Sequence, residues 1–313
     1  MKMLLLGADG QVGFALQSAL SALGVVAATT RKGVDSGGFA CLQADLSNFD
    51  SLRELILAER SDWIVNAAAY TAVDRAEAEP DLAMRINAQA VSVIAEAARS
   101  IDARVIHYST DYVFPGDGRI PWAEDNRTAP LGAYGHSKLA GERALRDSGA
   151  AHLILRTAWV YGPRGNNFLR TMLRLAGERA RLSVVADQFG TPTTAVLIAQ
   201  VTAQLIVTLR QATSDDPRFG TYHLTASEHT SWYEFANEIF DLAHTANLIA
   251  RRPEVSAITS AELKTPAQRP AWSVLDTHKL RSTFDVFLPH WRQGLQSTLC
   301  AIADERTRWP QQS

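Results

Sequence analysis

Short apolar runs alternate with helically spaced apolar residues along the first half of the chain. Runs at residues 3–6, 25–30, 62–69 and 104–111 predict strands buried on both faces. Apolar residues at helical spacing follow at 14–23 and 52–57, and a long amphipathic helix is predicted over 76–101. Repeated strand-then-helix units predict an α/β fold with a Rossmann-like, doubly wound parallel sheet.

The strict alternation loosens beyond residue 165. Helical patterns at 166–175, 195–209, 232–242 and 291–302 are mixed with short strand patterns at 182–185 and 220–224. A chain of 313 residues is also long for a single core. We therefore expect an NAD(P)-binding Rossmann domain over residues 1–165. Residues 166–313 should form mainly a smaller, mixed α/β substrate lobe, with the chain free to cross between the two.

Composition excludes several classes of function. The chain is 46% hydrophobic and 20% charged, and 31 basic against 33 acidic residues give a net charge of −2, so nucleic acid is not an expected partner. No apolar run approaches the ~18 residues that span a membrane, and the first is too short for a signal peptide, which predicts a cytoplasmic protein. Cys41 and Cys300 lie far apart, and the histidines form no paired motif, so we expect inert or buried thiols, no disulfide and no metal site.

The first strand leads into the sequence GADGQVG at residues 7–13, which opens a helix. Gly7 would allow a tight turn, Gly10 would let a pyrophosphate approach the backbone, and Gly13 would let helix and strand pack closely. The spacing is GxxGxxG and glycine turns join many strands to helices, but the position after the first strand favours dinucleotide binding.

The second strand ends at Thr30 and Arg31, where an enzyme that binds NAD would carry an acidic residue. The missing carboxylate and the adjacent cations favour a 2′-phosphate, which predicts NADPH over NADH. The alternative is that Arg31 only begins a solvated loop, and use of NADH stays open. Asp45, after the next short apolar stretch, can accept a hydrogen bond from the adenine amino group.

Tyr134 and Lys138 are four residues apart in a predicted helix, so their side chains share one face. A lysine ammonium beside a phenol should lower the pKa of that phenol. Thr110, at the end of a central strand, adds a hydroxyl that can bind a substrate carbonyl. Together they suit reduction of a ketone, with the proton from Tyr134. A Tyr-x-x-x-Lys sequence can also be a chance feature of a solvated helix, and Asn87 in the preceding helix is expected to be buried and satisfied.

Five runs carry a family resemblance: 7–13 (GADGQVG), 65–74 (VNAAAYTAVD), 107–114 (HYSTDYVF), 134–142 (YGHSKLAGE) and 156–161 (RTAWVY). They resemble the extended branch of the short-chain dehydrogenase/reductase superfamily, which acts on nucleotide sugars, and within it the dTDP-4-dehydrorhamnose reductase family. The resemblance runs nearly end to end. It implies NADPH-dependent reduction of the C4 ketone of dTDP-4-dehydro-L-rhamnose to dTDP-L-rhamnose, the last step in making that sugar donor for polysaccharides.

The resemblance also implies roles for single residues. Tyr134 would be the proton donor and Lys138 its partner, and Thr110 and Asp111 would contact the reacting sugar. The implied cofactor contacts are Gly10, Gln11, Val12, Thr30, Asp45, Leu46, Ala69, Tyr70, Thr71 and Tyr108, besides Tyr134 and Lys138. The further substrate candidates are Trp159, Asn167 and Arg269; Trp159 could instead be a plain core aromatic and Arg269 a surface arginine.

Some relatives are metal-linked dimers through acidic residues near the first helix. This chain has Phe14, Ala15 and Leu16 there, so a metal is doubtful and a homodimer stays open. Two other functions also remain. The chain could reduce another nucleotide ketosugar, although no cysteine or histidine sits where an epimerising base is expected. It could also be a non-catalytic NADP-binding regulator, like the beta subunit of methionine adenosyltransferase, but the presence of Thr110, Tyr134 and Lys138 together argues against that.

Overall fold

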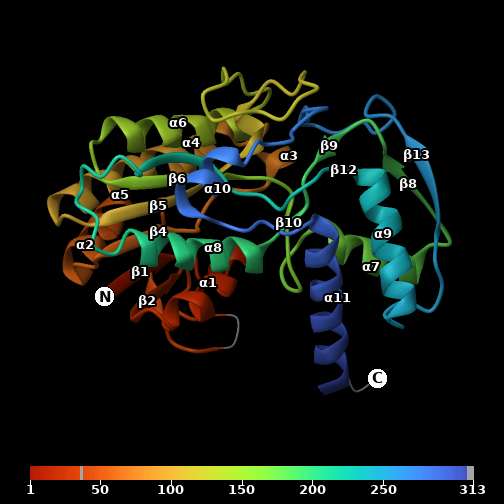
Figure 1. The fold of residues 1–313 in the computed structure, drawn as a ribbon, viewed down its shortest axis with the longest axis horizontal. Coiled ribbons are helices and arrows are strands. Elements are labelled where there is room, and N and C mark those ends of the chain that lie inside the picture. Colours follow the sequence, from red (N-terminus) through yellow and green to blue (C-terminus); the bar gives the residue numbers. More distant parts are fainter. Residues whose placement is uncertain (36–37, 309–313) are drawn as a thin grey trace.

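The computed structural model describes residues 1–35 and 38–308, and a seven-stranded parallel sheet is its centre (Figure 1). The strands are β1 (Lys2–Leu6), β2 (Val25–Thr30), β3 (Leu42–Gln43), β4 (Trp63–Asn66), β5 (Arg104–Thr110), β6 (His152–Thr157) and β11 (Gly220–His223). Their order is β11-β6-β5-β4-β1-β2-β3, and every pair is parallel. The predicted doubly wound α/β fold is confirmed.

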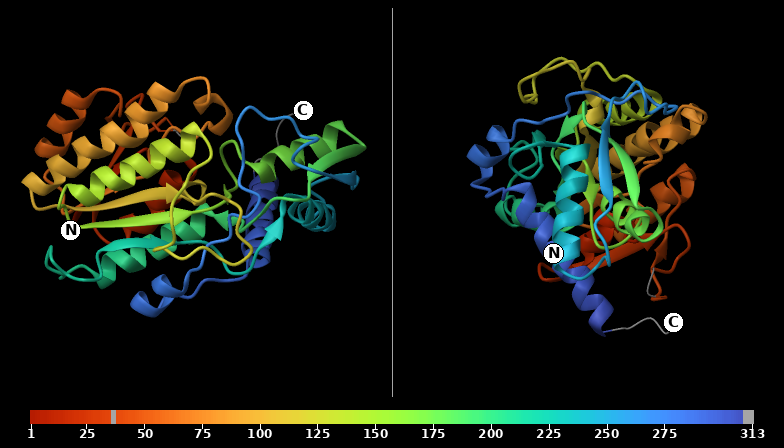
Figure 2. Two further views of the ribbon diagram at one scale, coloured as in Figure 1. Left: turned by 90° about the horizontal axis from the view of Figure 1, so that it is seen from above. Right: turned by 90° about the vertical axis from the view of Figure 1, so that its right-hand side faces the viewer.

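Helices cover both faces of this sheet (Figures 1 and 2). One face packs on α1 (Gln11–Ser21) and α8 (Ala195–Thr208), and the other packs on α2 (Phe49–Glu59), α5 (Ala90–Ser100) and α6 (Ala133–Asp147). Within β1, Met3 and Leu5 face the first layer, while Leu4 and Leu6 face the second. A strand buried on both faces needs apolar residues at every position, which explains the continuous apolar runs.

The long helix predicted over 76–101 is confirmed over residues 80–100, but it begins later than expected and contains a π-helical turn. The segment consists of α3 (Val73–Ala76), a turn, and then the continuous run α4 (Pro80–Met84), η1 (Arg85–Gln89) and α5. Pro80 has no amide hydrogen and a fixed φ, so a helix readily begins there. The π-helical turn places the carbonyl of Asn87 so close to α6 that a Cβ built on Gly141 would lie 2.0 Å from its oxygen.

Residues beyond 165 also contribute to the sheet layer. The edge strand β11 pairs with β6, α8 packs against α1, and α10 (His278–Phe284) packs against β11. The chain therefore crosses back to the sheet after it has entered the second lobe. The division into two domains at residue 165 stays a prediction.

The second lobe is built from two long helices, a helix at its start and several short strand pairs. Its elements are α7 (Phe168–Glu178), α9 (Trp232–Thr245), α11 (Trp291–Arg308), β8 (Arg181–Val185), β13 (Glu254–Ile258), β7 (Val160–Tyr161), β10 (Thr193–Thr194), β9 (Phe189–Gly190) and β12 (Thr230–Ser231). Phe235 and Ile239 of α9 belong to the same apolar cluster as Met3 and Leu5 of the sheet, and side chains of α8 such as Leu205 lie in it too. One core therefore extends from the sheet into the lobe.

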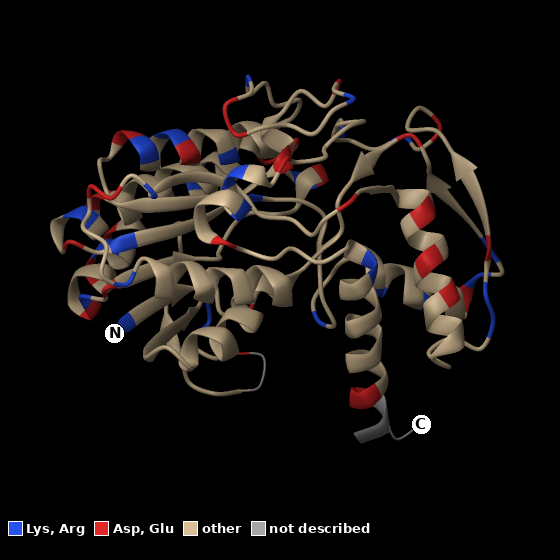
Figure 3. Cartoon of the chain, viewed as in Figure 1, with Lys and Arg blue, Asp and Glu red and all other residues tan. Residues whose placement is uncertain are grey.

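Charged side chains of both signs are mixed over the helices of the sheet layer, and α9 carries a row of acidic residues (Figure 3). No described helix combines the length and the apolar character needed to cross a membrane. Cys41 and Cys300 are free thiols; Cys41 is partly buried and Cys300 is exposed, so neither is fully buried, and the expectation that they are inert stays a prediction.

Candidate active site

The site lies at the edge of the sheet where the parallel strands end. The loops after β1, β4, β5 and β6 all leave the sheet at this edge, because parallel strands share one direction. They carry the glycine-rich turn, residues 67–71, residues 110–114 and residues 158–162. The residues selected from the sequence as catalytic, and many of those selected for the cofactor, are therefore on adjacent loops or on α6.

The glycine-rich turn has the geometry that a dinucleotide diphosphate requires. Gly7 has φ +80°, and a Cβ at this position would lie 2.8 Å from Ala68. A Cβ on Gly13 would lie 2.0 Å from the carbonyl oxygen of Gly7, so helix and strand can pack only around a glycine. Gly10 is the N-cap of α1 and has no side chain to occupy the free amides of Gln11 and the next residues. These amides at a helix N-terminus fit an anionic diphosphate.

Asn167 joins this turn to the second lobe. Its Nδ2 donates to Oε1 of Gln11 (2.8 Å) and to the carbonyls of Gly162 (3.0 Å) and Arg164 (3.1 Å). Its Oδ1 accepts from the amide of Arg170 (3.0 Å) and thereby caps α7. Both the nitrogen and the oxygen of the Asn167 side-chain amide thus have partners within the protein. These contacts hold Gln11 in place. The predicted contact between Asn167 and a nucleotide diphosphate stays a prediction.

The end of β2 carries two exposed cations, Arg31 and Lys32, next to a buried hydroxyl. Thr30 is buried, and its Oγ1 donates to the carbonyl of Val34 (2.8 Å), whereas Arg31 is exposed. Arg31 is therefore better placed than Thr30 to meet a 2′-phosphate. Asp45 accepts hydrogen bonds from the hydroxyl and the amide of Ser47, which lower the pKa of its carboxyl group, and Leu46 beside it is buried.

Hydrogen bonds from the side chain of Asn87 fix the loop after β4, which contains Ala69, Tyr70 and Thr71. The side chain of Asn87 accepts from the amide of Tyr70 (2.8 Å), and its Nδ2 donates to the carbonyl of Tyr70 (3.0 Å) and to Oγ of Ser137 on α6 (3.0 Å). The expectation that Asn87 is buried and satisfied is confirmed. Its role is to join the predicted cofactor loop to α6, which carries Tyr134 and Lys138.

Tyr134 and Lys138 lie on one face of α6, and Thr110 lies at the adjoining end of β5. Burial raises the pKa of Tyr134 to about 12, although a hydrogen bond with Thr110 acts in the opposite direction. The net lowering of this pKa that the pairing with Lys138 predicts is not seen in the protein without cofactor, because burial penalises the phenolate and sets the direction of the shift. The phenol is therefore fully protonated at neutral pH.

The ammonium group of Lys138 is buried and has its own partners. Nζ donates to the carbonyl of Tyr108 (2.6 Å) and lies 3.3 Å from Nε2 of His107. Burial lowers the pKa of Lys138 to about 8, and the carboxylate of Glu142 acts against this shift. The side chain of Tyr108 points toward α8, where its hydroxyl lies 2.8 Å from that of Thr202, so this residue meets Lys138 through its backbone.

Asp111 follows Thr110 and is buried beside it. Oγ1 of Thr110 donates to Oδ1 of Asp111 (3.0 Å) and accepts from the amide of Tyr112 (3.2 Å), which caps the short helix η2 (Asp111–Val113). Burial raises the pKa of Asp111 to about 7, because hydrogen bonds from Ser273 and Thr110 offset the desolvation only in part. A carboxyl group that titrates near neutral pH at the end of a central strand is suited to a polar substrate.

Trp159 and Arg269 lie at the junction with the second lobe. Trp159 adopts φ +47°, a strained conformation for a residue with a side chain, and its ring stacks on Trp232 with centroids 3.4 Å apart. Arg269 donates to Oδ2 of Asp74 (2.7 Å) and to the carbonyl of Ala267 (3.2 Å). The Arg269 guanidinium is thus already paired, and the proposed substrate contacts of both residues stay predictions.

Sequence reasoning missed the buried residues behind this site. Glu142 lies on α6 one turn beyond Lys138, and it pairs with Ser109 and Arg156 from two strands. A signal was present, because Tyr134, Lys138 and Glu142 follow one another at intervals of four residues and therefore share a helix face. The partners could not be found in this way, since strand pairing alone brings them together.

Comparisons with known proteins agree with this geometry. The family model described as RmlD substrate binding domain matches residues 1–303. A dTDP-4-dehydrorhamnose reductase of Escherichia coli is 48% identical over 299 residues, which cover 96% of this chain and 97% of the relative. A crystal structure of a dTDP-4-dehydrorhamnose reductase from Clostridium acetobutylicum has a TM-score of 0.83 at 34% identity, covering 96% of this chain and 99% of that one. Another from Bacillus anthracis, in complex with NADP, has a TM-score of 0.82 at 34% identity, with the same coverage of both chains.

Proposed function

Because the chain belongs to the RmlD substrate binding domain family and is an oxidoreductase of the dTDP-4-dehydrorhamnose reductase type, we propose that it reduces the C4 ketone of dTDP-4-dehydro-L-rhamnose to dTDP-L-rhamnose. The observation that carries this proposal is that Thr110, Tyr134 and Lys138 lie together at the sheet edge that also carries the glycine-rich turn. A non-catalytic regulator would not need a buried lysine and a protonated tyrosine at this place.

The protein supplies the proton and the charges for this reduction. When bound, the reduced nicotinamide cofactor supplies the hydride. Tyr134 then gives its proton to the oxygen of the former ketone, and its high pKa ensures that the proton is present beforehand. Thr110 binds the same oxygen through its hydroxyl, and Asp111 beside it contacts the sugar. The positive charge of Lys138 favours the tyrosinate that forms when Tyr134 has lost its proton.

We further propose that NADPH is the preferred cofactor. Arg31 is exposed at the end of β2, and no acidic residue stands at positions 30–32 to repel a 2′-phosphate. The Bacillus anthracis relative in complex with NADP supports this choice. The test is the ratio of kcat/KM for NADPH to that for NADH. We expect a ratio above one that falls in Arg31→Ala, and a wild-type ratio below one would contradict the proposal.

A direct assay tests the reaction itself. The purified protein is incubated with NADPH and either dTDP-4-dehydro-L-rhamnose or other dTDP- and GDP-linked ketosugars, while the absorbance of the reduced cofactor is followed. We expect oxidation that depends on the dTDP-4-dehydro-L-rhamnose and gives dTDP-L-rhamnose. Faster turnover of another ketosugar would show that the proposed substrate is wrong. No turnover with any of them would overturn the proposed function.

A further inference from the structure

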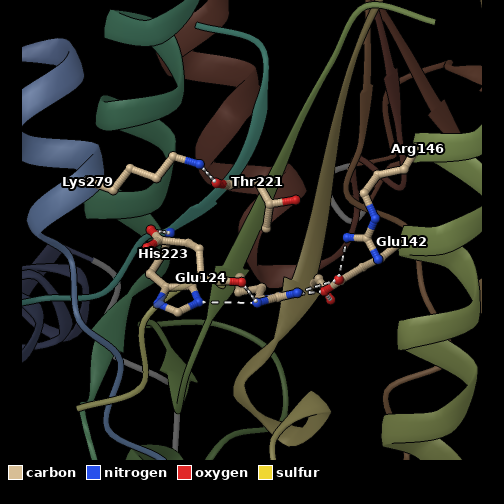
Figure 4. A network of polar contacts seen from close by, with 8 residues as sticks. Glu124, Glu142, Arg146, Thr221, His223 and Lys279 are labelled. Carbon is tan, nitrogen blue, oxygen red and sulfur yellow. Dashed lines mark hydrogen bonds and ion pairs between the residues drawn. The ribbon is translucent and has the colours of Figure 1, made fainter. Parts of the chain in front are cut away.

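A buried ionic network is centred on Glu142 (Figure 4), which lies on α6 one turn beyond Lys138. The side chain of Glu142 is 0% exposed. Its Oε1 accepts from Oγ of Ser109 (2.5 Å) and Nε of Arg156 (2.9 Å), and its Oε2 accepts from Nη2 of Arg156 (2.8 Å) and Nη1 of Arg146 (3.0 Å). Each carboxylate oxygen thus has two donors, so this charge is held in one geometry.

Side chains from three turns of α6 form hydrogen bonds with β5, and Glu142 supplies one of them. The Tyr134 phenol bonds to Thr110, the Lys138 ammonium bonds to the carbonyl of residue 108, and the Glu142 carboxylate bonds to Ser109. Three successive turns of the helix are therefore tied to three successive residues of the strand. A shift of the helix along the strand would break all three ties together.

We propose that Glu142 is a positioning residue for the reaction, whose buried carboxylate fixes α6 on β5 and sustains the positive charge of Lys138. The inference rests on the proposed function of Lys138 and extends it to a residue that touches neither substrate nor cofactor. Arg156 keeps the carboxylate in place, because its own Nη1 donates to the carbonyl of Glu124 (3.2 Å) and its guanidinium lies over the ring of Phe114 (5.1 Å to the centroid).

The other groups around Lys138 offer its ammonium little electrostatic support. On β5, burial and the neighbouring ammonium lower the pKa of His107 well below its usual range, so its ring is neutral. On α6 itself, Tyr134 is protonated at neutral pH. From η1, Asn87 contributes an uncharged amide. The carboxyl group of Asp111 titrates near pH 7 at the end of β5.

The remaining charges are two arginines that pair with Glu142. Arg156 comes from β6 and Arg146 from the next turn of α6, and both pair with the carboxylate. Glu142 is accordingly the charged group that acts against the loss of the Lys138 charge on burial. Glu142 and Lys138 are four residues apart on α6, so their side chains are neighbours on one helix face. Replacing Glu142 should therefore lower the pKa of Lys138 by about one unit or more, as expected when a nearby opposite charge is lost.

The variant Glu142→Gln tests this inference, since it keeps the shape and removes the charge. The pKa of Lys138 is measured by NMR titration of the free protein labelled with 13C at lysine Cε; the chain has five lysines, and Lys138→Arg assigns the signal. We expect a pKa at least about one unit lower in the variant. The matched control is Glu96→Gln, which removes an exposed carboxylate on α5 and should leave the pKa unchanged. An unchanged pKa in Glu142→Gln would overturn the inference.

Glu142→Gln leaves Arg156 buried and short of its counter-charge, which can prevent folding. The double variant Glu142→Gln with Arg156→Met removes both buried charges, and it should show the same lowered pKa. The pH dependence of kcat/KM, which reports the groups of the free enzyme, provides a second measurement. Loss of activity at high pH should set in about one unit earlier, so that at pH 9 kcat/KM falls about tenfold below its wild-type value. A lowered pKa without this kinetic shift would contradict the proposed role of Lys138 and leave that of Glu142 intact.

Discussion

Gly141 of α6 lies so close to the backbone of η1 that even a methyl group at this position should disturb the site. A Cβ on Gly141 would lie 2.0 Å from the carbonyl oxygen of Asn87, whereas real Cβ contacts essentially never fall below 3.0 Å. Gly141→Ala must therefore move α6 away from η1 by about 1 Å, since both partners in the clash are backbone atoms that cannot rotate aside. Such overpacking typically costs about 1–3 kcal/mol of unfolding free energy.

The same displacement should reduce catalysis. Tyr134 and Lys138 move with α6, while Thr110 stays on β5, so the three groups separate. A misplacement of ~1 Å can lower kcat by about 100-fold. The assays are urea denaturation and turnover of NADPH with the dTDP-ketosugar. The control is Gly177→Ala on the exposed side of α7, where a Cβ would meet nothing within 4 Å. This variant should gain up to about 1 kcal/mol of unfolding free energy, because alanine favours a helix over glycine, and it should keep its kcat. Wild-type stability and kcat in Gly141→Ala would refute the reasoning.

Three further substitutions test the site. Tyr134→Phe should lower kcat by ~10²- to 10⁴-fold with NADPH binding intact, because it removes the proton and keeps the ring; normal turnover would exclude Tyr134 as the donor. Gly13→Ala should weaken NADPH binding in equilibrium titration, because its Cβ would lie 2.0 Å from the carbonyl of Gly7 and deform the turn. Since the pKa of Asp111 is raised from 3.8 to about 7 on folding, the native state binds this proton more tightly and loses up to about 4 kcal/mol of stability between pH 4 and 7. Asp111→Asn should therefore stabilise the protein more at pH 8 than at pH 4 in urea denaturation, and an equal effect at both would contradict the raised pKa.

The features that follow from local sequence were predictable. The apolar runs that became β1 and β2, the glycine turn before α1 and the shared face of Tyr134 and Lys138 depend on neighbours in the chain, so spacing alone reveals them. The resemblance to known reductases added Gln11 and Tyr108, which no spacing rule indicates.

Features that depend on distant contacts were not predictable. The π-helical turn at η1 depends on the approach of Gly141, more than fifty residues later. The pKa of Tyr134 is set by its burial, which a helix pattern does not measure. Arg269 was identified as a possible phosphate ligand, but its pairing with Asp74 spans most of the chain. Likewise, the strand predicted over 220–224 could not be assigned to the main sheet until its pairing with β6 was seen.

The apolar core that runs from the sheet into the lobe has a consequence for how the protein can be divided. α8 lies against α1 and belongs to the same cluster as the sheet residues Met3 and Leu5, so a fragment cut at residue 165 would uncover this face and leave β6 as a bare edge. We expect such a fragment to aggregate rather than fold. Evolution or engineering that exchanges one half of this chain for another must therefore carry α8 and β11 along with the nucleotide-binding half.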